Sequence, residues 1–217
     1  MDTPVLVVNF KTYEKGSGKH AETLVKKCEK VSKETGKNIV LAVQNADIYR
    51  LSNFTELEVF AQHTDPENFG SNTGKDLVET IKFNGATGTL INHSEDNQDL
   101  KSIQKVVKKC RENGLTSIVC VDSLELAEKV DEFSPDFIAY EPEELIGGDV
   151  SVSEDKPEVV EKVVETVETE VLAGAGVKTG KDVKKVLELG GEGVLVASGI
   201  VKAEDVEKSL KDMVEPL

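Results

Sequence analysis

The chain has few cysteines and no long apolar stretch. Its three cysteines, Cys28, Cys110 and Cys120, are odd in number and lack CxxC spacing, which argues against a disulfide framework and against a zinc site. We expect them to be core thiols. No apolar run approaches the roughly 18 residues that a membrane span needs, and the first residues lack the basic stretch and cleavage site of a signal peptide. The sequence therefore predicts a soluble cytoplasmic protein.

Positive charge is also scarce. Lys and Arg number 26 against 41 Asp and Glu, and the formal net charge is −15. Nucleic acids and anionic membranes demand basic surface, so neither is expected as a partner. An ordinary solvated acidic surface is the favoured interpretation, and salt adaptation is the alternative. Any anionic ligand needs a local positive site.

Nothing in the sequence divides the chain. There is no linker rich in Pro, Gly or Ser, no shift of composition and no low-complexity tract. Barrels of the α/β type routinely reach 217 residues as one unit. We therefore expect a single domain over residues 1–217.

Short apolar runs alternate with charged segments of helical spacing, such as 20–35, 98–113, 157–167 and 179–189. The connection "NADIYRLSNFTE" reads as short and irregular. Eight strands alternating with helices favour a closed, parallel, eight-stranded (β/α)₈ barrel, and an open doubly wound sheet is the alternative. The candidate strands are 5–10, 38–43, 57–62, 88–92, 116–122, 136–141, 170–176 and 193–198.

Polar residues gather at the carboxyl ends of these strands, where such barrels carry function. Asn9 lies at the end of the first strand with Lys11 just beyond it, His93 lies at the end of the fourth, and Glu141 ends the sixth. Each alone has a structural explanation, as a strand cap, a surface lysine, a structural histidine or a solvated carboxylate. The turns "GAGV" and "ASGI" after the last two strands offer bare N–H groups that can bind an anion. Together on one face, these groups favour a catalytic site.

Five motifs resemble the triosephosphate isomerase family in its short archaeal type. They are "NFKTY", "INHSE", "YEPEELIGG", "GAGV" and "LVASGI", and they occur in the family's order and positions over essentially the whole chain. The resemblance implies interconversion of D-glyceraldehyde 3-phosphate and dihydroxyacetone phosphate through an enediolate. It also implies that no cofactor and no metal ion is required.

The resemblance assigns a role to each site residue. Glu141 is the general base, in a pocket where burial can raise its pKa. His93, Lys11 and Asn9 supply donors to the developing oxyanion. A neutral His93 follows the established division of labour in triosephosphate isomerases. Glu95 would organise Lys11 and His93. The residues expected to bind substrate are Asn9, Phe10 and Lys11, with the phosphate held by backbone groups at Ile146, Gly147, Gly176, Ala197 and Ser198.

The chain departs from the family pattern in two places. Residues 142–150 resemble a lid that closes over the intermediate, but 147–149 read Gly-Gly-Asp where the family usually has Gly-Thr-Gly. Asp96 and Asn97 stand where a basic residue usually follows the His-Ser-Glu motif. We expect slower catalysis or a different ionic optimum.

The segment 61–74 resembles the family's third loop, which reaches into a neighbouring subunit, so we expect a homo-oligomer, either a dimer or a tetramer. Two other functions stay open. A different phosphate-binding barrel enzyme, such as an epimerase or lyase of phosphorylated sugars, would share the glycine turns without needing the four catalytic residues together. A non-catalytic sugar-phosphate sensor should tolerate their loss.

Overall fold

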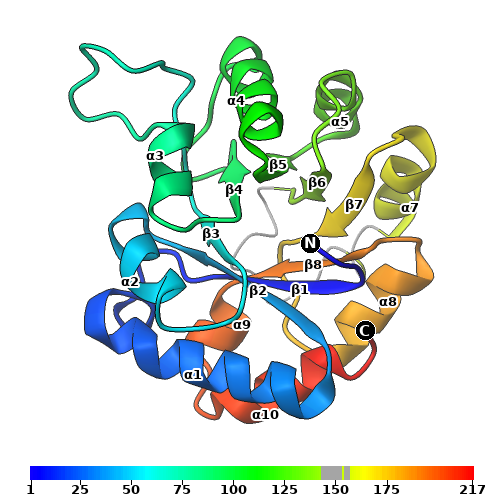
Figure 1. The fold of residues 1–217 in the computed structure, drawn as a ribbon. Helices are drawn as coiled ribbons and strands as arrows, with labels where there is room; N and C mark the ends of the chain where they lie inside the picture. Colours follow the sequence, from blue (N-terminus) through cyan, green and yellow to red (C-terminus); the bar gives the residue numbers. More distant parts are fainter. Residues whose placement is uncertain (143–152, 154–156) are drawn as a thin grey trace.

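A computed structural model describes residues 1–142, 153 and 157–217. The strands form one closed parallel barrel in chain order (Figure 1). Val5 on the first strand pairs both with Asn38 on the second and with Gly193 on the last, which closes the ring. This confirms the predicted (β/α)₈ barrel over the open sheet. The strands are β1 Val5–Asn9, β2 Asn38–Val43, β3 Val59–Ala61, β4 Gly88–Ile91, β5 Thr116–Val121, β6 Phe137–Tyr140, β7 Glu170–Ala173 and β8 Gly193–Val196.

Helices surround the barrel on its outer side (Figure 1). The four segments that we predicted to be helical are helices, with ends within two residues of the prediction. Among the described residues, no helix combines the length and apolar character that a membrane span requires. The helices are α1 Gly18–Thr35, α2 Ile48–Ser52, α3 Val78–Phe83, α4 Leu100–Asn113, α5 Leu124–Asp131, α7 Pro157–Thr166, α8 Gly180–Glu188, α9 Ser198–Val201 and α10 Val206–Val214.

The connection after β2 is more regular than we predicted. It contains a 3₁₀ turn at Asn45–Asp47 followed by the short helix α2. Ile48 and Leu51, one helical turn apart, are fully buried, and Arg50 forms an ion pair with Asp47 at 2.7 Å. Burial of this pair of side chains stabilises a helical turn that the sequence alone indicates only weakly.

Side chains alternate along each strand between the barrel interior and the helical shell. On β1, Val5 and Val7 belong to the inner cluster, whereas Leu6 and Val8 pack with the helices. The same period of two continues past the strand ends, so it directs Asn9 towards the barrel mouth. Glu141 follows Ala139 of the inner cluster in the same way. The three cysteines are free and buried, as predicted.

Candidate active site

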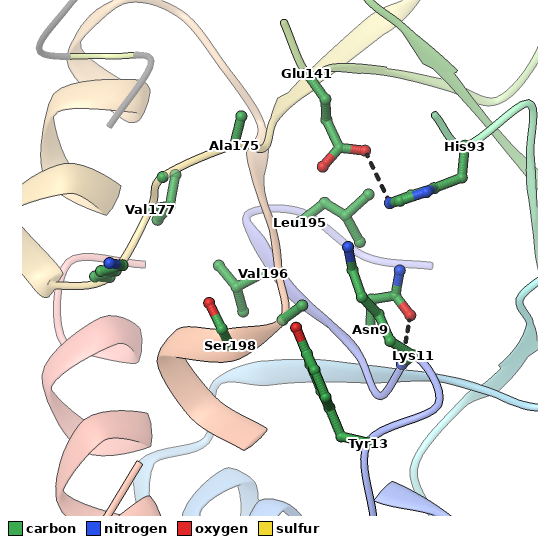
Figure 2. Close-up of a pocket in the computed structure, with 13 residues that line it drawn as sticks. Asn9, Lys11, Tyr13, His93, Glu141, Ala175, Val177, Leu195, Val196 and Ser198 are labelled. Carbon is green, nitrogen blue, oxygen red and sulfur yellow. Dashed lines mark hydrogen bonds and ion pairs between the residues drawn. The ribbon is translucent and has the colours of Figure 1, made fainter. Parts of the chain in front are cut away.

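A pocket lies at the carboxyl ends of the strands (Figure 2). Phe10 is fully buried in the helical shell, so its side chain packs in the core rather than in this pocket. Ile146 and Gly147 lie outside the described residues. The predicted site residues that line the pocket are Asn9, Lys11, His93, Glu141, Gly176, Ala197 and Ser198.

Glu141 projects into the pocket from the end of β6. Its Oε2 lies 3.8 Å from Nε2 of His93 (Figure 2) and has no hydrogen-bond partner within the described part of the chain. Burial raises the pKa of Glu141 above its ordinary value, and this outweighs the lowering effects of His93, the Cys120 thiol and Lys11. A buried carboxylate with an unsatisfied oxygen is well suited to accept a proton.

Gly174 makes room for this carboxylate. A Cβ atom at Gly174 would lie 2.4 Å from Oε1 of Glu141, so any side chain there would displace the Glu141 carboxylate. The backbone holds Gly174 in place, because its N–H donates to the carbonyl of Tyr140 at 2.9 Å. The sequence indicates the "GAGV" turn only as an anion site, whereas its first glycine leaves space for the Glu141 side chain.

His93 is buried and fixed by the segment that follows it. The backbone N–H of Glu95 donates to Nδ1 of His93 at 3.1 Å. A ring nitrogen that accepts a hydrogen bond carries a lone pair, so this contact fits the neutral imidazole with its proton on Nε2. Nε2 is the atom that faces Glu141. The ring is therefore arranged to donate into the pocket.

Lys11 has a left-handed backbone, with φ of 46°. A non-glycine residue adopts this conformation when its surroundings hold it there. The Lys11 N–H donates to Oδ1 of Asn9 at 2.9 Å, and its carbonyl accepts from the Gln62 side chain at 3.1 Å. The Lys11 ammonium donates to Oε1 of Glu95 at 2.8 Å. Glu95 thus contacts both Lys11 and His93, as the resemblance implied.

The turns after β7 and β8 pack closely at the other end of the pocket. A Cβ atom at Gly199 would lie 3.3 Å from the Lys178 Cα and from the Val177 carbonyl. Ala175 and Gly176 both have positive φ, at 64° and 73°. The two turns therefore pack backbone against backbone at this end of the pocket. Among the described residues, no group of three or more His, Cys, Asp or Glu side chains is arranged to hold a metal ion.

Comparison with known proteins assigns the family. The family model described as triosephosphate isomerase matches residues 4–214. The chain belongs to the triosephosphate isomerase family. It is 48% identical to the triosephosphate isomerase of Methanothermus fervidus, over 99% of both chains. It is 44% identical to that of Saccharolobus solfataricus, over 99% of this chain and 96% of the relative. The archaeal resemblance read from the five motifs is confirmed.

A solved structure shares the fold of the family. The crystal structure of triosephosphate isomerase from Bartonella henselae superimposes with a TM-score of 0.76 at 19% identity, and covers 98% of this chain and 99% of the other. At this level of identity, the likeness concerns the barrel and its connections.

The sequence patterns did not lead us to predict three further residues at the site, Gln62, Cys120 and Tyr13. Gln62 follows β3 and donates to Asn9 and Lys11, and the period of two from the inner residue Phe60 could have indicated it. The Cys120 thiol, on the neighbouring strand, lies close enough to Glu141 to lower the pKa of its carboxyl group. Tyr13, the last residue of the "NFKTY" motif, lines the pocket but was given no role.

Proposed function

We propose that the protein interconverts D-glyceraldehyde 3-phosphate and dihydroxyacetone phosphate, the reaction for which the relatives are named. The observation that carries the proposal is the unpartnered Oε2 of Glu141, 3.8 Å from Nε2 of His93. The proton acceptor, Glu141, and the proton donor, His93, therefore face the same small part of the pocket. That is the arrangement needed for proton abstraction beside a carbonyl group.

Glu141 removes a proton from the carbon next to the carbonyl. The electron pair of the broken C–H bond forms the enediolate, and the negative charge develops on the former carbonyl oxygen. Nε2 of His93 protonates that oxygen and recovers a proton from the neighbouring hydroxyl. Glu141 then returns its proton to the former carbonyl carbon. No electrons are gained or lost overall, so the step is an isomerisation.

Lys11 and Asn9 stabilise the charge that develops in this step. Preorganised donors aimed at an oxyanion are most effective where water is excluded. The Lys11 side chain is only 13% exposed, and its ammonium is held by Glu95. Asn9 accepts from the Lys11 N–H through Oδ1, which leaves its amide N–H₂ to face the substrate. The substrate phosphate binds at Gly176, Ala197 and Ser198, where bare backbone N–H groups can surround an anion.

A coupled isomerase assay tests the proposal. The wild type, Glu141→Gln and Glu170→Gln are compared at low and high salt. Glu170 is exposed at the amino end of β7, so its replacement is a matched control for the loss of one carboxylate. We expect isomerase activity and solvent deuterium exchange at the carbon next to the carbonyl in the wild type and the control. Inactivity of the wild type at both salt concentrations would reject the proposal.

The same variants separate the other two functions. An epimerase or lyase of phosphorylated sugars would act on a different phosphorylated sugar and be inactive with the trioses. A sugar-phosphate sensor would bind its ligand without turnover, and Glu141→Gln would leave that binding unchanged. The arrangement of His93, whose Nδ1 accepts from the Glu95 N–H and whose Nε2 faces Glu141, favours the isomerase over both.

We also propose that the active form is a homo-oligomer located in the cytoplasm. The segment between β3 and α3 extends away from the barrel (Figure 1), and Phe69 within it is 67% exposed. Residues 70–74 beside it are largely exposed as well. Substitutions at Asn72 or Thr73 should lower both self-association and activity. A fully active monomer in sedimentation experiments would contradict this.

A further inference from the structure

Tyr13 lines the pocket, but it has no role in the isomerisation proposed above. It is half-buried, packs against the core and lines the pocket. Figure 2 shows its hydroxyl end pointing into the space between Ser198 and Lys11. Within the described ranges, no hydrogen bond satisfies this hydroxyl; the bonds at Tyr13 are accepted by its backbone carbonyl. A phenol placed in this way is a free donor at the phosphate end of the site.

The ring of Tyr13 is held from two sides. Its carbonyl accepts from the Gly16 N–H at 2.8 Å and from the Ser17 hydroxyl at 2.9 Å, which fixes the turn that carries it. The Lys202 ammonium lies over the ring, 4.5 Å from its centroid. A cation over an aromatic face is attracted by the ring quadrupole. These contacts therefore fix the orientation of the ring before a substrate binds.

Lys202 also links this ring to the turn after β8. Its backbone N–H donates to the carbonyl of Ser198 at 3.0 Å, one helical turn earlier. The single turn of α9 thus has Ser198 in the pocket at its start and an ammonium group over Tyr13 at its end. On a protein with net charge −15, a positive charge behind this wall of the pocket favours an anionic group there.

We propose that Tyr13 is a substrate-binding residue, whose hydroxyl donates a hydrogen bond to the phosphate group of the triose, with Lys202 as the positioning residue for its ring. The inference rests on the proposed isomerase function for the identity of the substrate. The free hydroxyl and its place beside Ser198 support the phosphate as acceptor. The carbonyl end of the substrate already has three donors, His93, Lys11 and Asn9.

Tyr13→Phe removes the hydroxyl and keeps the ring. A hydrogen bond to a charged group is strong enough that its loss should raise KM for the phosphorylated triose about tenfold, with a smaller change in kcat. The dissociation constant of inorganic phosphate, measured by calorimetry on the full chain, should rise by a similar factor. The kcat/KM for D-glyceraldehyde, which lacks the phosphate, should stay unchanged. Tyr49→Phe is the matched control, because Tyr49 is 66% exposed on α2.

Lys202→Gln tests the positioning role. We expect about a threefold weaker binding of inorganic phosphate, since the ring loses its cation, and recovery of binding in Lys202→Arg. If Lys202 acts through Tyr13, the Gln substitution should have little further effect in the Tyr13→Phe background. Full additivity of the two substitutions would show that Lys202 acts on phosphate directly and would reject its positioning role.

The outcomes distinguish this inference from the proposed function. An inactive wild type that still binds inorganic phosphate more tightly than Tyr13→Phe would reject the isomerase and keep the phosphate contact. Equal KM and equal phosphate affinity in an active wild type and Tyr13→Phe would overturn the contact alone. An equal loss of activity towards D-glyceraldehyde would also overturn it, because the hydroxyl would then act at the reacting carbons. Failure of the wild type to bind phosphate would overturn it as well.

Discussion

Two carboxyl groups at opposite ends of the barrel, Asp131 and Glu141, have pKa values shifted in opposite directions. Asp131, at the amino end, accepts hydrogen bonds from the N–H groups of Glu168 and Thr169 and from the Thr169 hydroxyl, at 2.6 to 3.1 Å. Burial alone would raise the pKa of Asp131, but these donors hold it below its ordinary value. Glu141, at the carboxyl end, is buried with one oxygen unpartnered within the described chain, and its pKa is raised. The hydrogen bonds to Asp131 stabilise its ionised form in the fold, whereas Glu141, with an oxygen that is free within the part of the chain that the structure describes, can accept a proton more easily.

The backbone shows the same contrast. Lys11, Asn92 and Ala175 have positive φ, and all three follow the carboxyl ends of strands around the pocket. Ser134, near the amino end, is the remaining non-glycine residue of this kind in the described part of the chain. Strained conformations persist only where surrounding contacts determine them. The structure therefore concentrates both electrostatic and conformational cost at the end of the barrel that carries the pocket.

The substitution Glu141→Gln should have the largest effect. We expect kcat to fall by about 10³-fold or more, because general acid–base catalysis is lost. The free energy of unfolding near neutral pH should stay equal or rise, because the amide does not have to be buried as a charge. Steady-state kinetics and urea unfolding on the same preparation measure both. A clear loss of stability would mean that Glu141 is also a structural carboxylate, and the contrast with Asp131 would fail.

Gly174→Ala tests whether the position of the base matters as much as its charge. The added methyl carbon would lie 2.4 Å from Oε1, so the carboxylate must move. Displacement of a catalytic group by about 1 Å can cost on the order of 10²-fold in rate, and we expect that loss in kcat with KM little changed. Gly114→Ala is the control for kcat, because no atom lies within 4 Å of its Cβ position and Gly114 precedes β5, at the end of the barrel opposite the pocket. Its φ of 66° means that this substitution should cost stability at the end of α4 while leaving kcat unchanged. Unchanged kcat in Gly174→Ala would show that Glu141 relaxes freely.

The pH dependence of activity should follow the raised pKa of Glu141. The base must be ionised, so kcat/KM should fall tenfold per pH unit below an apparent pKa that lies above the ordinary value of 4.5. The acid limb should be unchanged in Tyr49→Phe and absent from the residual activity of Glu141→Gln. An acid limb at or below pH 4.5 in the wild type would contradict the buried, unpartnered state of the base.

Stability should depend on pH with opposite signs at the two ends. The pKa of Glu141 is raised in the folded state. Its favourable contribution to the free energy of unfolding is therefore fully present below about pH 4.5 and is lost as the pH rises through the folded-state pKa. Asp131 has a lowered pKa, so its contribution is present above about pH 3.8 and is lost as pH falls through the folded value. Unfolding of Glu141→Gln and Asp131→Asn from pH 3 to 8 should therefore give differences from the wild type of opposite sign near neutrality.

The sequence predicted the barrel well because alternation of strands and helices is a property of local segments. It also predicted that Asn9, Lys11, His93 and Glu141 lie together at one face, since each stands at or just after the carboxyl end of an apolar run. Gly174 could not be assigned to the base, because that role depends on β6 and β7 being neighbours with Tyr140 paired to Ala173.

Two other contacts of the site join residues that are distant in the sequence, and no local sequence pattern indicates them. The Cys120 thiol meets Glu141 because β5 and β6 pair with Cys120 opposite Ala139. Tyr13 is separated by 189 residues of sequence from Lys202, and only the closed ring brings the two together. Site residues that end a strand are thus predictable, whereas residues that act across neighbouring strands require the structure.

The smallest expected effect is on the structural carboxylate. In Asp131→Asn the amide oxygen can still accept from Thr169, but the N–H₂ group then faces the Glu168 N–H, donor against donor. Loss of one hydrogen bond to a partly buried charged group should lower the free energy of unfolding by about 1 kcal/mol. The site lies at the opposite end of the barrel from the pocket, so kcat and KM should not change. Glu132→Gln, at the exposed neighbouring residue, controls for loss of charge. If Asp131→Asn lowers kcat without lowering stability, the two ends of the barrel are coupled, and the separation between structural and functional carboxylates is wrong.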